Sequence, residues 1–220
     1  SININNTGKI TATAGNKAIG IYGNQNAVAG TNSSGNISLF TGTEIDMSSS
    51  KGGVGIYSNG ISISGLGNTK ITVGENGTGL YIKDSNANFV DLDLNLTGDN
   101  SVGVYTDGSA SFGGTGNINI DGKGIVVFNV AGSGTFNENF TVNSTEESQY
   151  ILQNIKDKIL YYNSTVNLGG GGTFVSGVNS AVLLGEDSIL NSENSNLVGI
   201  ALTGGYVNGL PVNINGEILE

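Results

Sequence analysis

Two aspartates, Asp91 and Asp93, have the spacing that catalysis by a pair of carboxylates requires. They lie in the stretch Asn88-Phe89-Val90-Asp91-Leu92-Asp93-Leu94-Asn95-Leu96, where Val90, Leu92, Leu94 and Leu96 alternate with polar residues. A period of two predicts a strand with both aspartates on its polar face, and paired carboxylates perform general acid–base work such as glycoside hydrolysis. Two solvated residues on an outer strand face explain the same pattern, so we assign no catalytic residue.

Other catalytic and metal chemistries lack the residues that they need. The chain contains no histidine and no cysteine, so neither a Ser-His-Asp nor a Cys-His nucleophile can be assembled and the usual zinc ligands are missing. The segment Gly113-Gly114-Thr115-Gly116-Asn117 has the glycines of a calcium-binding nonapeptide, but Asn stands where the Asp ligand belongs. We therefore expect no enzyme, no metal site and no cofactor.

A recurring phrase of a glycine, an apolar residue and a tyrosine supplies the candidate binding residues. It reads Gly20-Ile21-Tyr22, Gly55-Ile56-Tyr57, Gly79-Leu80-Tyr81 and Gly103-Val104-Tyr105, and returns with another third residue as Gly124-Ile125-Val126 and Gly199-Ile200-Ala201. If Val54 and Ile56 point inward, alternation sends Gly55 and Tyr57 outward. The sequence thus predicts a column of outward glycines beside a column of outward tyrosines, namely Tyr22, Tyr57, Tyr81 and Tyr105.

Two interpretations of the tyrosines stay open. The rings could lie over the bare glycine backbone and shield it, as cross-strand aromatic pairs do. Alternatively, the column could be a ligand-binding site that stacks sugars or contacts a protein partner.

The spacing of the phrase predicts the architecture that positions these side chains. Successive tyrosines are 35, 24 and 24 residues apart, and period-two strands alternate with turns rich in Gly, Asn, Asp and Ser. Repeats of roughly this length, each with several short strands, are typical of solenoids that bury their apolar side by stacking. We predict an all-β parallel β-helix of about nine coils, with residues 1–220 forming a single segment.

One segment departs from the strand pattern. Ser144-Thr145-Glu146-Glu147 has the spacing of a capping box, and Ile151, Leu152, Ile155, Ile159 and Leu160 follow at helical spacing. The sequence therefore predicts a short helix over residues 145–158, within an insertion at 144–160 that covers the rod or protrudes as a binding element.

Charge excludes one class of partner. The formal net charge is −10, and the eight basic residues are lysines scattered along the chain. Because binding to a phosphate backbone requires clustered cations, we expect no nucleic acid. The sequence also has no run of about 18 apolar residues, the length that a spanning helix needs.

The repeated G-I-Y phrases, the Asn/Gly turns and strands such as Thr69-Lys70-Ile71-Thr72-Val73 resemble passenger domains of Gram-negative autotransporters (type V secretion). Within this family, the chain resembles the large fusobacterial surface adhesins in particular. The resemblance implies a right-handed β-helix that is secreted across the outer membrane and displayed at the cell surface. It also implies a longer parent chain, anchored through a C-terminal outer-membrane barrel that is absent from this chain. It carries no catalytic motif.

Three functions follow as expectations. The first is an adhesin segment, monomeric on its own, that binds a host cell-surface glycan or protein receptor or other bacteria in a biofilm, or that acts as a stalk for a distal site. The second is a trimeric surface head or spike fibre. The third is a carbohydrate-active β-helix enzyme that uses Asp91 and Asp93.

Overall fold

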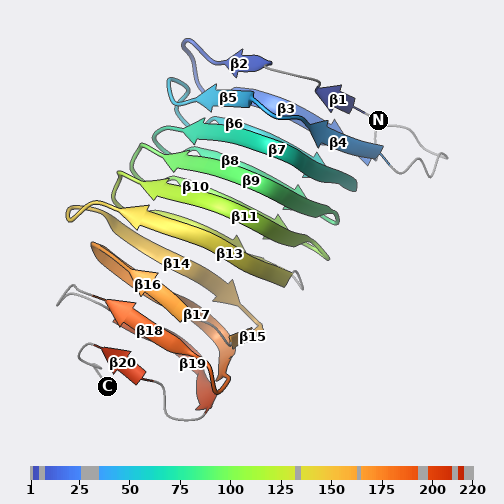
Figure 1. The fold of residues 1–220 in the computed structure, drawn as a ribbon. Coiled ribbons are helices and arrows are strands. Elements are labelled where there is room, and N and C mark those ends of the chain that lie inside the picture. Colours follow the sequence, from blue (N-terminus) through green and yellow to red (C-terminus); the bar gives the residue numbers. More distant parts are fainter. Residues whose placement is uncertain are drawn as a thin grey trace.

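The computed structural model describes residues 2–4, 8–25, 35–131, 135–162, 165–192, 198–209 and 213–215. In this part the chain folds as an all-β parallel solenoid of about six turns, stacked one on another (Figure 1). The solenoid expected from the repeats is confirmed, but the number of turns is lower than the nine expected, which were counted over the whole chain. The described residues include no helix with the length and apolar character that a membrane crossing requires.

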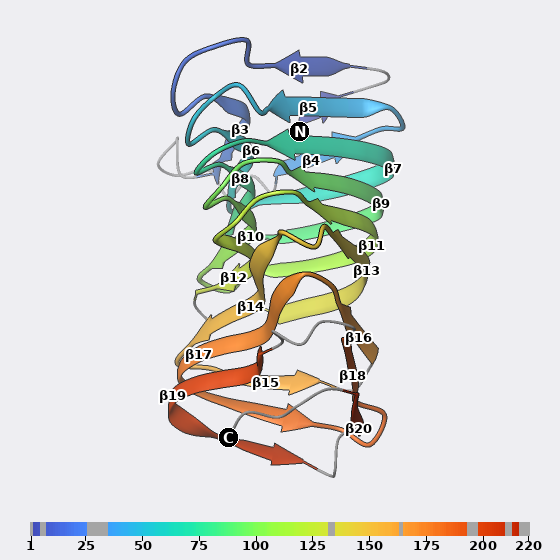
Figure 2. The ribbon, with the colours of Figure 1, turned by 90° about the vertical axis from the view of Figure 1, so that its left-hand side faces the viewer.

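One sheet extends along the whole solenoid (Figure 2). The four tyrosines of the repeated phrase lie on its strands. Its strands, from the N-terminal end, are β3 (Ile19–Asn24), β6 (Val54–Asn59), β8 (Thr78–Lys83), β10 (Val102–Asp107), β12 (Ile125–Val130), β14 (Gln149–Lys156), β17 (Gly171–Leu184) and β19 (Val198–Gly209), with β15 (Ile159–Tyr162) paired to the second half of β17. All of these pairs are parallel. Each strand therefore lies directly on the corresponding strand of the previous turn.

The opposite wall of the solenoid is an eight-stranded parallel sheet. It contains β1 (Ile2–Ile4), β2 (Lys9–Thr11), β4 (Gly35–Leu39), β5 (Thr43–Met47), β7 (Ile61–Val73), β9 (Asn86–Leu96), β11 (Ser111–Ile120) and β13 (Thr135–Ser144). The first half of β7 pairs with β4 and its second half with β5. The register of β7 against β9 shifts between Gly65 and Asn68, so the long strand follows two sides of each turn.

Toward the C-terminal end a third sheet takes over one of these sides. Its strands are β16 (Thr165–Leu168), β18 (Ile189–Ser192) and β20 (Asn213–Asn215). Figure 1 shows these strands following β13 along the solenoid. The eight-stranded sheet ends at β13, so among the described strands only the sheet that carries the tyrosines is common to both ends.

The core is a narrow column of aliphatic and phenylalanine side chains between the sheets. Ile45, Ile71, Leu94 and Ile118 follow one another in register and are fully buried. In the middle of the rod the core contains phenylalanine side chains that contact one another. The ring centroids of Phe112 and Phe128 are 5.8 Å apart. Burial of such columns on successive turns is the main stabilising contribution in a solenoid.

The strands that carry the tyrosines do not alternate strictly, and this overturns the prediction of outward glycines. In β6 both Gly55 and Ile56 are buried, while Val54 and Tyr57 are half-buried. The same pattern recurs in β8 and β10. Because two consecutive residues point inward, the glycines of the repeated phrase face the core. We call Gly20, Gly55, Gly79 and Gly103 the glycine column. A methyl group on Gly79 would lie 2.6 Å from the Gly103 carbonyl oxygen and from Leu94 Cδ1.

The helix predicted over residues 145–158 is wrong. The segment consists of a turn and β14, with β15 beginning directly after it at Ile159, and Ser144 is the last residue of β13. In the turn, the Ser148 backbone N–H donates to the Thr145 carbonyl at 3.1 Å, and the Ser148 hydroxyl donates to the Ile120 carbonyl at 2.9 Å. The helical spacing arose because β14 also has consecutive inward residues, Leu152 and Gln153, which turns a period of two into apparent steps of three and four.

Two smaller expectations about register are also wrong. Gly124-Ile125-Val126 is not an equivalent of the tyrosine phrase, because Val104 and Tyr105 pair with Phe128 and Asn129. Gly124 instead lies in a turn with φ +67°. In β9, Val90 does not share the inward face of the leucines: it is 58% exposed, and Phe89 is buried in its place.

Candidate functional site

The four tyrosines of the repeated phrase form one stacked column on the outside of the solenoid. Ring centroids are 5.0 Å apart for Tyr22 and Tyr57, 5.0 Å for Tyr57 and Tyr81, and 4.9 Å for Tyr81 and Tyr105, with interplanar angles of 10°, 15° and 13°. The strand registers place them directly above one another. Tyr22 is the most exposed at 55%, while the other three are half-buried. We call these residues the tyrosine column.

A second outward column lies three residues before each tyrosine. Its members are all β-branched and follow one another in register: Ile19, Val54, Thr78, Val102, Val126, Ile151 and Thr173. Ile19 is exposed and the others are half-buried. β-Branched side chains pack well on a pleated surface, so this β-branched column gives the sheet a continuous and mostly apolar strip beside the rings.

A third column, two residues after each tyrosine, is polar: Asn24, Asn59, Lys83 and Asp107. Lys83 Nζ lies 3.2 Å from Asp107 Oδ2, and the Tyr81 hydroxyl donates to the same oxygen at 3.5 Å. The Asn24 amide donates to the Tyr22 hydroxyl at 3.0 Å. The polar column thus holds ring hydroxyls in place. We call the three columns together the tyrosine face.

The electrostatic setting of the central ring follows from this packing. Burial between its neighbours raises the pKa of Tyr81 above the ordinary tyrosine value, and the nearby Asp107 carboxylate raises it further. Hydrogen bonding to Asp107 in turn raises the pKa of Lys83. The Tyr81 phenol therefore remains a neutral donor at physiological pH.

The stacking limits what the tyrosine column can bind. At centroid distances of about 5 Å, each inner ring face is already covered by a neighbouring ring, so a sugar has no room to stack between them. A ligand that contacts the column meets ring edges and hydroxyl groups. The interpretation that the rings shield the glycine backbone does not hold either, since the glycine column faces the core.

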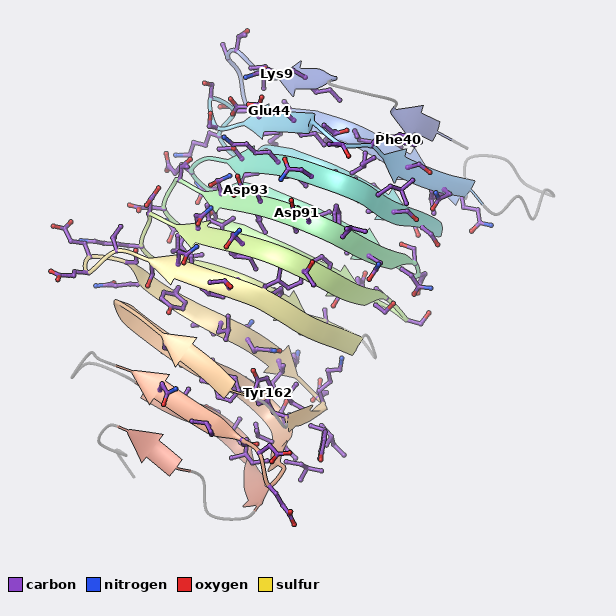
Figure 3. The ribbon with its side chains drawn as sticks, viewed as in Figure 1. Lys9, Phe40, Glu44, Asp91, Asp93 and Tyr162 are labelled. Carbon is purple, nitrogen blue, oxygen red and sulfur yellow. The ribbon has the colours of Figure 1, made fainter. Side chains whose placement is uncertain are left out.

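The two aspartates lie on the opposite wall, on β9, and both are half-buried (Figure 3). Each is held by an amide: Asn68 donates to Asp91 Oδ2 at 3.0 Å, and Asn119 donates to Asp93 Oδ1 at 2.8 Å. The Asn119 amide also donates to Asn95 at 2.9 Å, within a ladder that continues to Asn143. Such amide ladders stabilise stacked strands, so both carboxylates take part in cross-turn contacts of the sheet.

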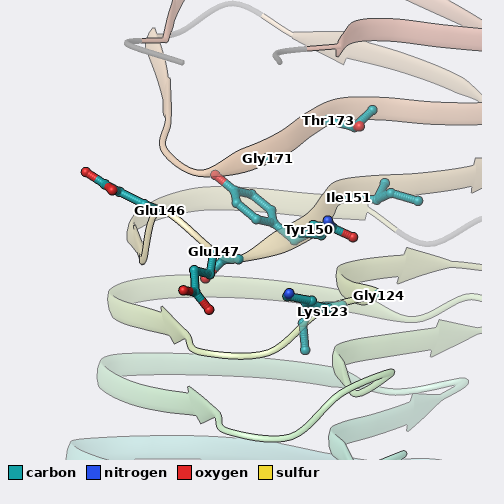
Figure 4. Close-up of a pocket in the computed structure, with 11 residues that line it drawn as sticks. Lys123, Gly124, Glu146, Glu147, Tyr150, Ile151, Gly171 and Thr173 are labelled. Carbon is teal, nitrogen blue, oxygen red and sulfur yellow. The ribbon is translucent and has the colours of Figure 1, made fainter. Parts of the chain in front are cut away.

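An open groove with a volume of about 580 Å³ lies where the turns before β12 and β14 separate (Figure 4). Its charged lining residues are Lys123, Glu146 and Glu147. At its inner end, the buried Tyr150 hydroxyl accepts a hydrogen bond from the Gly169 N–H at 3.1 Å, and burial raises the pKa of this phenol. The Ser148 hydroxyl, which also lines the groove, donates to the Ile120 carbonyl and is therefore engaged within the turn.

Within the described residues, no cluster of three or more His, Cys, Asp or Glu side chains that could hold a metal ion occurs. The sequence patterns identified the tyrosine column but missed the two columns beside it. The sequence did contain a signal for these two columns. Each tyrosine of the tyrosine column is preceded, three residues earlier, by Ile, Val or Thr and followed, two residues later, by a polar residue.

The fold and the outward columns define the chain as a parallel β-solenoid with one aromatic face. No protein-family model, curated protein or solved structure matches the chain.

Proposed function

We propose that this chain is a segment of a cell-surface adhesin, a right-handed β-helical part of an autotransporter passenger whose tyrosine face docks onto a partner molecule. The observation that carries the proposal is the outward column Tyr22, Tyr57, Tyr81 and Tyr105, stacked in register over four turns. Tyrosine is enriched at protein interfaces because it offers a large apolar body with a polar tip.

The architecture and composition support this role. A chain without cysteine and with few charges can cross membranes unfolded and then fold turn upon turn, since each turn interacts only with its neighbours. The covered ring faces favour a protein surface over a stacked glycan as the partner. The resemblance to autotransporter passengers supports secretion to the cell surface and a longer parent chain.

Binding of the purified chain to host cells and to a panel of host surface proteins and glycans tests the proposal. The informative variant is Tyr57→Ala/Tyr81→Ala/Tyr105→Ala, first shown to be folded by circular dichroism. Tyr57→Phe/Tyr81→Phe/Tyr105→Phe keeps the ring stack and removes only the hydroxyls, which separates ring edges from hydrogen bonding. Asn95→Ala/Asn119→Ala/Asn143→Ala is the matched control, because it removes a ladder of equal length from the opposite wall.

Loss of binding in the tyrosine-to-alanine variant, with binding kept in the asparagine control, supports the proposal. Binding that is unchanged in a folded tyrosine variant contradicts a docking role for this face. If the unaltered chain binds nothing, the segment acts as a stalk and the docking proposal fails.

A further inference from the structure

We propose that the tyrosine face binds a second copy of this chain, with the two solenoids antiparallel. The two-fold axis runs along the strands, midway between the levels of Tyr81 and Tyr105. The inference names a partner for the face on which the proposed function rests. It departs from the monomer expected from the sequence.

The first support is the low charge of this face in a strongly acidic chain. The chain carries eight lysines and 18 acidic residues. The strands β3, β6, β8, β10, β12 and β14 together contain three charged residues, Lys83, Asp107 and Lys156. Depletion of charge with enrichment of tyrosine distinguishes interface centres from the remaining surface. The acidic residues that would repel a second copy lie on other parts of the chain.

The second support is the way the columns match under this two-fold axis. A rotation about an axis along the strands keeps each column opposite itself and exchanges the levels on either side of the axis. Tyr81 then faces Tyr105 of the second copy, and Thr78 faces its Val102. Farther out, Val54 faces Val126 and Ile19 faces Ile151 of the second copy, because these residues occupy successive levels of one column.

The charges determine which orientation is favoured. In the antiparallel pair, Lys83 faces Asp107 of the second copy, and Asp107 faces its Lys83, so two ion pairs form across the axis in addition to the pair at 3.2 Å within each chain. In a parallel pair the axis runs along the solenoid, so the columns are reversed and the levels are kept. Asp107 then faces Val102 of the second copy, and Lys83 faces its Thr78. Burying a carboxylate against an apolar side chain, with no opposite charge facing it, is costly. Charge complementarity therefore selects the antiparallel arrangement.

The size of the face predicts the strength of the pair. Six strands spaced by about 4.8 Å, each about 20 Å long, give about 580 Å² per copy. Twice this area is about 1,200 Å², at the lower limit of specific interfaces. We therefore expect a weak and reversible dimer that forms with rising protein concentration.

Sedimentation velocity over a concentration series tests the inference through complementary charge reversals. Lys83→Glu sets a carboxylate against Asp107 of the second copy, and Asp107→Lys sets an ammonium group against the second copy's Lys83. Each variant alone should therefore dimerise at least about tenfold more weakly than the unaltered chain.

An equimolar mixture of the two variants restores both opposite-charge contacts, because the introduced carboxylate then faces the introduced ammonium group while Asp107 of one chain faces Lys83 of the other. The mixture should regain the association of the unaltered chain as a heterodimer. Lys51→Glu is the control, because it makes the same charge change in another exposed pair, Lys51 with Glu75.

Each outcome decides for or against the pair. Association of the unaltered chain and the Lys51→Glu control, loss in each single variant and recovery in the mixture support the antiparallel pair. A chain that stays monomeric, single variants that associate normally, or a mixture that fails to recover overturns it. If self-association fails while host proteins still bind and this binding requires the tyrosines, only this inference falls and the proposed function stands.

Discussion

The turns from β6 to β11 and the turns from β12 to β18 share one strand pattern but differ in the residue that fills one inward column. In the N-terminal turns this residue is glycine, at Gly55, Gly79 and Gly103, and in the C-terminal turns it is Val127, Leu152 and Phe174. The outward residue changes at the same place along the rod, from tyrosine to Asn129 and Asn154. One strand pattern thus supports two kinds of core and two kinds of surface.

The difference shows what the glycines do. Without side chains at these positions, the opposite wall approaches closely, and Ile71 Cγ2 lies 2.7 Å from where a Gly55 methyl group would be. In the C-terminal turns, larger side chains occupy this space and the long wall is divided between β13 and the separate sheet of β16, β18 and β20. The glycine column therefore occurs where two continuous sheets lie close together. The tyrosines lie in regular register on one of these two sheets.

The largest expected effect tests this close approach. Gly79→Ala should destabilise the chain by about 3 kcal/mol, because the new methyl group would lie 2.6 Å from the Gly103 carbonyl oxygen and from Leu94 Cδ1, and backbone cannot move aside easily. Urea denaturation followed by circular dichroism measures the change.

Gly199→Ala is the matched control, since Gly199 occupies the equivalent column position in β19. Among the described residues, the nearest atom to its methyl group would be Leu190 Cδ2, at an ordinary 3.5 Å. We expect a change within about 0.5 kcal/mol. Equal costs at both positions would show that the walls are not closer in the N-terminal turns.

The second prediction concerns the stack on the outer surface. Tyr81→Ala removes a ring with two stacked neighbours and should cost about 1–3 kcal/mol, at about 0.5–1.5 kcal/mol for each aromatic contact. Tyr22→Ala removes one stacked neighbour and should cost about half as much. Thermal unfolding of both variants, with Tyr81→Phe to confirm that the ring and not the hydroxyl is responsible, measures the difference. Equal losses at the two positions would argue against stacking as the cause.

The solenoid and the outward tyrosines could be predicted because both depend on spacing within the sequence. The glycine at 24-residue steps and the alternating strands contain that information directly. The inward direction of Gly55, Gly79 and Gly103 could not be predicted, because two consecutive inward residues break the period of two. The same break made Leu152 and Ile155 resemble one face of a helix. Such irregularities are determined by the strand of the next turn, which lies about 24 residues away, and a local pattern does not show them.

The third prediction has the opposite sign. Thr106 is fully buried in a core column between Ile82 and Val130, and its hydroxyl has no hydrogen-bond partner among the described residues. Thr106→Val should stabilise the chain by about 1 kcal/mol, because it removes an unsatisfied polar group and keeps the shape. Ser148→Ala in the other region should destabilise it by about 1 kcal/mol, since the Ser148 hydroxyl donates to the Ile120 carbonyl. A loss of stability in Thr106→Val, measured by urea denaturation, would show that its hydroxyl is satisfied in solution.

The smallest expected effect is a decrease in the free energy of unfolding at alkaline pH. One tyrosine causes it in the N-terminal turns and another in the C-terminal turns, for different reasons. Burial between stacked rings, assisted by Asp107, raises the pKa of Tyr81, whereas enclosure behind the groove raises the pKa of Tyr150. Below the ordinary tyrosine pKa of 10.0, each phenol is protonated in the folded and the unfolded chain, and the stabilisation is fully present. As pH rises further, the unfolded chain releases these protons first, so stability falls until the pH passes the raised folded-state values.

Phenolate absorbance during titration, compared among the unaltered chain, Tyr81→Phe and Tyr150→Phe, should assign a late-titrating group to each region. If neither variant loses a late-titrating group, the rings are not shielded from solvent as the structure places them.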